Sequence, residues 1–305
     1  MEKRNRFLKI AVVSAGLYCL GTAGVAMPSV SAASTVSAGD TAVTAGGVSV
    51  ADGTGRAARA EQTWTKRMGT QTLGIEKTDP ELAALMKGYI YGDIACQAAL
   101  TPQEQDMVTL AVLTVNQDYG LLRKNVQGAL QYGVTPLEIR ETLYHMAPYI
   151  GFPRVIEAVE VMNGVFRKNG IRLPLDAQGT TTDADRFAKG LKFQVDTYGE
   201  RITRMRAGTP DFQKHLQDDL SAFCFGDIYT RGTLDLKTRE MITVAAIGAL
   251  GNDSPQFISH VRGYLAAGAT QNEVVGVLTV LNPYVGFPRT LNMLREANSV
   301  FTPAR

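Results

Sequence analysis

The sequence has few of the residues that build redox or metal sites. Its 305 residues include three cysteines and three histidines. No histidine stands in a cluster of carboxylates or thiols at the spacing of metal ligands. Neither a glycine-rich phosphate loop nor a Gly-x-Ser-x-Gly motif is present. These absences argue against a dedicated metal centre, a nucleotide phosphate site and an α/β-hydrolase nucleophile, and we expect no metal and no cofactor.

The chain also lacks an excess of charge of either sign. Lysine and arginine number 31 against 29 aspartates and glutamates, which gives a net charge of +2. A nucleic-acid-binding domain normally carries a strongly basic face. We therefore expect neither DNA nor RNA as a partner.

The first residues have the layout of a secretory signal peptide. Basic residues between positions 3 and 9 precede an apolar run, Ile10–Met27, and small residues follow at Val30–Ala32. An uncleaved membrane anchor is the alternative, but glycines interrupt the run and it is short for a spanning helix. We expect residues 1–32 to be removed and the protein to be exported, either periplasmic or secreted, with no membrane attachment after cleavage.

Residues 33–63 are mostly serine, threonine, alanine and glycine. Such a segment buries too little apolar surface to offset its ordering entropy, so we expect a flexible tether. Beyond it, Cys96 and Cys224 are the cysteines left after signal cleavage. An oxidising compartment would permit a disulfide between them, and two unpaired buried thiols are the alternative.

The chain contains a long internal repeat. The segment Glu138–Arg154 returns as Glu273–Arg289, and both copies end in Pro-Tyr-x-Gly-Phe-Pro-Arg, 135 residues apart. Two copies at such a long period indicate a duplicated domain rather than a solenoid. We place the first unit at 64–170, a linker at 171–182 and the second unit at 183–305.

Both units are predicted to be all-α. Capping boxes recur at Thr101–Glu104, Thr135–Glu138 and Thr270–Glu273. Two segments, 107–115 and 241–250, are apolar nearly all round, which is typical of helices buried on most sides. A helix from about 183 to about 206 is expected to begin the second unit. No window alternates apolar and polar residues as a strand would.

Glu240 and His260 are the strongest candidates for a catalytic pair. They lie on successive helices of a predicted antiparallel hairpin, each about seven to ten residues from the turn, so the helical rise brings them to similar depth. A carboxylate beside an imidazole forms an acid/base couple. The alternative is an ordinary exposed pair. In the first unit Asp106 and Asn125 align with them, and asparagine cannot titrate, so we expect that copy of the site to be degenerate.

Several other residues are candidates for binding a substrate. Arg289 follows a Gly-Phe-Pro turn, where a guanidinium could bind a carboxylate through two hydrogen bonds. Arg239 directly precedes Glu240 and Arg262 follows His260 by two positions, so both are alternative residues for holding an anion. His145 could contribute from the first unit across the interface between the repeats. In each case the alternative is structural: a solvated helix-start charge for the arginines and a packed histidine for His145.

These residues together resemble the carboxymuconolactone decarboxylase family, in a tandem-repeat form. The resemblance is carried by 237–246, 259–263, 268–273 and 283–288, and the first unit keeps the glycine, capping and Pro-Tyr-x-Gly-Phe-Pro parts. It implies two all-α units of the alkylhydroperoxidase D type that form an internal pseudo-dimer. Since the copies of such units associate, it also implies a homo-oligomer.

The resemblance offers two chemistries. A peroxidase branch uses Cys-x-x-Cys before the site histidine, where this chain has Asp253 and Gln256, so that branch is disfavoured. The decarboxylase branch uses neither metal nor organic cofactor and implies Glu240 and His260 as its proton-transfer pair. An arginine such as Arg289 would hold a small organic acid. Because the known lactone decarboxylase is expected in the cytoplasm, the substrate here stays open, and a non-catalytic exported scaffold or ligand-binding protein is the alternative.

Overall fold

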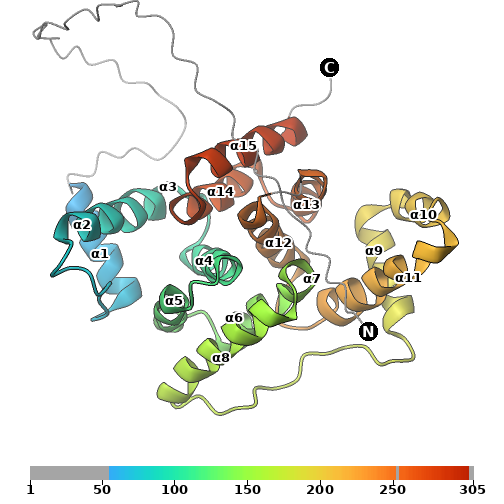
Figure 1. Ribbon diagram of the computed structural model, residues 1–305, viewed down its shortest axis with the longest axis horizontal. Helices are drawn as coiled ribbons and strands as arrows, with labels where there is room; N and C mark the ends of the chain where they lie inside the picture. The colour runs from blue at the N-terminus through green and yellow to red at the C-terminus, as the bar shows by residue number, and fades with distance from the viewer. Residues whose placement is uncertain (1–54, 252–253, 302–305) are drawn as a thin grey trace, which may run out of the picture. The chain divides into compact units, whose positions relative to one another are not determined.

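A computed structural model describes residues 55–251 and 254–301 (Figure 1). The predicted signal peptide and most of the predicted tether lie outside these ranges. Every regular element in the described ranges is helical, which confirms the all-α prediction. No helix among them is long and apolar enough to cross a bilayer.

The two units carry corresponding helices in the same order. The first contains α1 (Arg56–Met68), α2 (Pro80–Lys87), the π-helix η1 (Gly88–Ile94), α3 (Ala95–Gln97), α4 (Pro102–Asn116), α5 (Tyr119–Gln131), α6 (Pro136–His145), α7 (Ala147–Ile150) and α8 (Phe152–Lys168). The second contains α9 (Arg186–Tyr198), α10 (Glu200–Ala207), the short 3-10 helix η2 (Asp211–Gln213), α11 (Lys214–Asp219), the π-helix η3 (Leu220–Tyr229), α12 (Leu236–Leu250), α13 (Ser254–Ala266), α14 (Gln271–Val285) and α15 (Phe287–Phe301).

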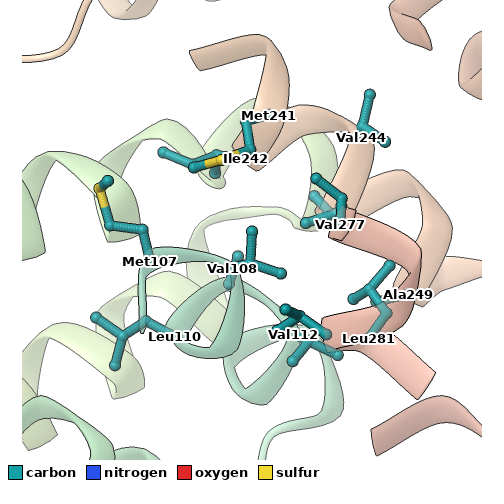
Figure 2. Packing of buried hydrophobic residues seen from close by; sticks show 14 of the residues in the cluster. Met107, Val108, Leu110, Val112, Met241, Ile242, Val244, Ala249, Val277 and Leu281 are labelled. Carbon is teal, nitrogen blue, oxygen red and sulfur yellow. The ribbon is translucent and has the colours of Figure 1, made fainter. Parts of the chain in front are cut away.

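The core lies where α4 meets α12. These are the two helices predicted to be apolar nearly all round, and the structure buries them on all sides. Figure 2 shows Val108 and Val112 of α4 near Ile242 of α12 and Val277 of α14. The contacts are reciprocal, because α4 packs on α14 of the second unit and α12 packs on α6 of the first. One continuous core therefore joins the tandem units as a pseudo-dimer.

A repeated Gly-Asp-Ile motif docks one outer helix in each unit. A Cβ at Gly226 would lie 2.2 Å from the carbonyl oxygen of Arg186 in α9, so only glycine allows the two backbones to approach this closely. The next residue, Asp227, accepts from Arg186 Nε at 2.8 Å. In the first unit Gly92 meets the Arg56 carbonyl in the same way, and Asp93 pairs with Arg56.

Two segments differ from the sequence predictions. The helix α1 begins at Arg56, inside the stretch predicted as a tether, because Ala60, Trp64 and Met68 form a buried stripe at helical spacing. The helix predicted from about 183 to 206 is broken at Gly199, whose φ of 72° no regular helix accommodates. This break turns α10 away from α9.

Candidate active site

The structure brings Glu240 and His260 together. Glu240, near the start of α12, is fully buried, and its Oε2 lies 2.8 Å from Nδ1 of His260 on α13. With the Glu240 oxygen as acceptor, Nδ1 of His260 carries a hydrogen and donates this hydrogen bond. In the described part of the chain the second ring nitrogen, Nε2, has no protein partner. Nε2 is thus left to act on a ligand.

Two tyrosines complete the shell of the carboxylate. The hydroxyl of Tyr198 in α9 donates to Glu240 Oε1 at 2.5 Å, and that of Tyr229 in η3 donates to the same oxygen at 3.0 Å. Burial beside the Glu240 charge raises the pKa of both hydroxyls, which keeps them protonated as donors. Three donors therefore satisfy Glu240 and fix the orientation of the His260 ring.

His260 opens onto a cavity of about 460 Å³. The edges of Tyr149 and Tyr198 flank the imidazole, each with a ring-centroid distance of 5.8 Å. The rest of the wall is mainly apolar, with a few polar groups; it comprises Pro148, Gln194, Arg201, Ile202, Met205, Leu220, Cys224, Phe225, Ile247, Leu250, Pro255, Gln256 and Ser259. An apolar pocket of this volume with a few convergent polar groups is typical of a small-molecule site.

His145 and Arg239 lie behind the site rather than in the cavity, which corrects the substrate contacts predicted for them. His145 is fully buried, and burial followed by the nearby Arg239 charge lowers its pKa. The neutral ring accepts from Arg239 and bonds Thr243 Oγ1 at 2.9 Å. Thr243 in turn contacts the hydroxyl of Tyr149 at 3.1 Å. These residues orient the tyrosines around the pair.

The guanidinium of Arg239 is itself committed to the backbone. It donates to the carbonyls of Arg231 and Gly232 at 2.8 and 3.0 Å. Burial lowers the pKa of Arg239 to about 10. Because its donors serve backbone carbonyls, Arg239 holds the loop before α12 in place.

The structure also separates Arg289 and Arg262 from the cavity, against the prediction. Arg289 donates to the Ala249 carbonyl at the end of α12, in a different hollow beside Glu296. Its counterpart in the first unit, Arg154, likewise donates to the Val115 carbonyl at the end of α4. Both arginines cap the C-terminal end of a core helix, where a cation is favourable. Arg262 is exposed on α13, two residues after His260 and hence on another face of that helix.

The functional residues that sequence reasoning missed come from α9, α10 and η3. Tyr198 and Tyr229 bind Glu240, and Arg201 lines the cavity. Arg201 donates to Ser259 Oγ next to His260, and its guanidinium lies over the Tyr198 ring at 5.4 Å. In the sequence, Arg201 stands in an arginine-rich helix that is typical of a solvated surface, so no local signal distinguished it.

The aligned place in the first unit, where a degenerate copy of the site was predicted, holds a much smaller hollow than the His260 cavity. Asp106 pairs with Arg67 at 3.2 Å, and Asn125 donates to the Leu121 carbonyl of its own helix. The hollow between them measures only about 20 Å³. Burial raises the pKa of Asp106 to about 6, with Arg67 acting in the opposite direction.

The described cysteines are free thiols. Cys96 is exposed, whereas Cys224 is buried and lines the cavity. Burial raises the pKa of Cys224 to about 12, so this thiol is not a thiolate nucleophile at neutral pH. Asp253, one of the two positions where a peroxidase would carry a thiol, lies outside the described residues, and the other, Gln256, lines the cavity. In the described ranges no group of three or more His, Cys, Asp or Glu side chains could hold a metal ion.

Comparison with known proteins identifies relatives of both units. A family model described as the carboxymuconolactone decarboxylase family matches residues 80–164 and 214–299. A 4-carboxymuconolactone decarboxylase of Acinetobacter baylyi is 28% identical over 120 residues, which cover 39% of this chain and 89% of the relative. A nitrosuccinic acid decarboxylase of Metarhizium robertsii is 32% identical over 77 residues, 25% of this chain and 54% of the relative.

A solved structure is similar over a larger share of the chain. It is described as a gamma-carboxymuconolactone decarboxylase subunit of Burkholderia xenovorans LB400. The match has a TM-score of 0.47 and 18% identity, and it covers 80% of this chain and 96% of the other.

Proposed function

The chain belongs to the carboxymuconolactone decarboxylase family, and from this premise we propose that its second unit is a cofactor-free acid/base enzyme. Its reaction is the removal of carbon dioxide from a small carboxylated organic molecule bound in the cavity beside His260. The observation that carries the proposal is the 2.8 Å contact of Glu240 Oε2 with His260 Nδ1, which leaves Nε2 for a ligand. The relatives named as decarboxylases support the reaction type.

The proposed chemistry is a proton transfer that follows loss of carbon dioxide. When the bond to the carboxylate carbon breaks, its electron pair stays on the substrate as an enolate-like carbanion, and carbon dioxide leaves. The resting ring of His260, with its proton on Nδ1, first takes up a solvent proton at Nε2, and the resulting imidazolium delivers that proton to the carbanion carbon. Glu240 stabilises the imidazolium through Nδ1, and delivery of the proton returns the ring to its neutral form. The substrate's own conjugation has to carry the transient negative charge.

The test is a screen of small carboxylic acids for carbon dioxide release by the purified chain. For an acid that is turned over, His260→Ala is expected to lower kcat by about 10²–10⁴-fold, the usual contribution of a positioned acid or base. His215→Ala is the matched control, because His215 is exposed on α11, and this variant is expected to keep the wild-type rate. A folded His260→Ala protein with unchanged turnover would remove His260 from the mechanism.

The same screen separates the enzyme from a ligand-binding protein. A protein that only binds acids would release no carbon dioxide from any of them, although the cavity would still take up ligands. The lactone named for the A. baylyi relative belongs in the panel as one candidate.

A further inference from the structure

One arginine stands on the rim of the His260 cavity without an acidic partner. Arg201 donates to Ser259 Oγ, and its guanidinium lies over the Tyr198 ring at 5.4 Å. Within residues 55–251 and 254–301 no carboxylate pairs with Arg201, whereas Arg204, three positions later, pairs with Glu200. The Arg201 guanidinium is thus held in place by a hydroxyl and an aromatic face while its charge stays unneutralised.

The other arginines near the site are already occupied. Arg239 donates to backbone carbonyls behind the pair, and Arg289 caps the end of α12 in another hollow. Of the described residues that line the cavity, Arg201 is therefore the one permanently cationic side chain. A guanidinium with free donors at the mouth of a cavity is suited to bind a carboxylate.

The rest of the wall favours hydrocarbon rather than further charge. Ile202 and Met205 line the cavity from α10, Phe225 from η3, and Ile247 and Leu250 from α12. A ligand whose anionic end meets Arg201 would lay its remaining atoms against these side chains. A second charge placed against them would lose its hydration without gaining a partner.

We propose that Arg201 is the residue that binds the substrate's carboxylate, and that the cavity selects organic acids with an apolar body. This inference rests on the proposed function for the location of the site. In that reaction the carboxylate at Arg201 is the one that stays on the molecule, because an ion pair stabilises the anion and opposes its loss as carbon dioxide. The group that is lost lies nearer His260.

The helix α10 is the element that creates this specificity. It follows Gly199, whose φ of 72° turns the chain across the cavity, and it supplies Arg201, Ile202 and Met205 to the wall. The corresponding stretch of the first unit, residues 69–79 between α1 and α2, contains no helix. At the place aligned with the Glu240–His260 pair, Asp106 and Asn125 of the first unit border a hollow of only about 20 Å³.

The experiment measures binding of hexanoate and of hexanamide, its neutral counterpart, to the full chain by ligand-observed NMR titration. We expect the wild-type protein to bind hexanoate about tenfold or more tightly than hexanamide, which corresponds to one charge-assisted contact. Arg201→Gln is expected to abolish that preference. Arg204→Gln, the matched control on the same helix, is expected to keep it.

A second variant tests the apolar wall separately. Met205→Ser is expected to weaken both ligands about threefold or more and to leave their ratio unchanged, since it removes apolar contact but no charge. Arg201 and Met205 are both exposed, and circular dichroism verifies that each variant is folded. The inference is overturned by wild-type protein that binds hexanoate no better than hexanamide or not at all, or by Arg201→Gln that keeps the preference.

These outcomes are distinguishable from failure of the proposed reaction. His260→Ala is expected to bind hexanoate as the wild-type protein does, because His260 acts on the reacting carbon and Arg201 on the retained carboxylate. If binding depends on Arg201 but no acid releases carbon dioxide, the reaction is wrong and the binding residue stands. If turnover is found and Arg201→Gln leaves hexanoate binding unchanged, the role of Arg201 is wrong and the proposed reaction stands.

Discussion

Replacing Glu240 with glutamine is expected to lower kcat for carbon dioxide release by about 10³-fold or more in a chain that stays folded. The side-chain amide keeps the shape of the carboxylate and still offers an oxygen to the hydroxyls of Tyr198 and Tyr229. Its NH₂ group, however, would face His260 Nδ1, which now donates to Oε2 at 2.8 Å. The ring would then accept at Nδ1 and carry its proton on Nε2, and the neighbouring charge that stabilises the imidazolium would be gone.

The measurement is the steady-state rate with the acid that the screen identifies, together with circular dichroism of the variant. Asp106→Asn is the matched control, because Asp106 occupies the aligned place in the first unit beside a hollow of only about 20 Å³. That variant is expected to keep kcat within about twofold of the wild-type value. Equal losses in both variants would mean that the carboxylates act through stability and not through the site.

Replacing Gly190 with alanine is expected to destabilise the chain by roughly 3 kcal/mol or more. The new Cβ would lie 1.9 Å from the carbonyl oxygen of Ser221 and 2.5 Å from the amide nitrogen of Gly226. Both are backbone atoms of η3, so no side-chain rotation relieves the contact, and α9 has to move away. Because α9 carries Tyr198, the variant should also lose the hydrogen bond to Glu240. Chemical denaturation gives the stability, and turnover gives the effect on the site.

Gly208→Ala is the control for this substitution. A Cβ at Gly208 would meet the Arg204 carbonyl at an ordinary 3.5 Å, so a change below about 1 kcal/mol is expected. The first unit offers an internal comparison: Ala60 stands four residues after Arg56, as Gly190 stands four residues after Arg186, and its side chain is buried. Equal denaturation midpoints for Gly190→Ala and wild-type protein would show that α9 is not docked as described.

The parts of the fold that depend on short-range sequence were predictable. The capping boxes at Thr101, Thr135 and Thr270 each form both of their hydrogen bonds, because a cap involves only residues three positions apart. The proximity of Glu240 and His260 followed from the geometry of a helix hairpin. The burial of α4 and α12 followed from apolar residues on every face of both segments.

The residues that complete the site were not predictable, because their positions depend on tertiary contacts. Gly199 looks like a tolerated glycine inside a helix, yet its left-handed φ ends α9 and aims Arg201 at the cavity. Arg289 has the sequence context of an anion clamp, but its carbonyl partner at the end of α12 comes from another helix. Tyr198 and Tyr229 lie outside the repeated motif, and only the packing of α9 and η3 brings them to Glu240.

The state of the His260 ring tests the central claim most directly, and it needs no substrate. Nitrogen-15 NMR of the imidazole at neutral pH reports which ring nitrogen carries the proton. We predict a proton on Nδ1 and a free acceptor at Nε2 in the wild-type chain, with the pattern reversed in Glu240→Gln. A wild-type ring protonated on Nε2, or one averaging between tautomers like a histidine in water, would contradict an acid/base site held by Glu240.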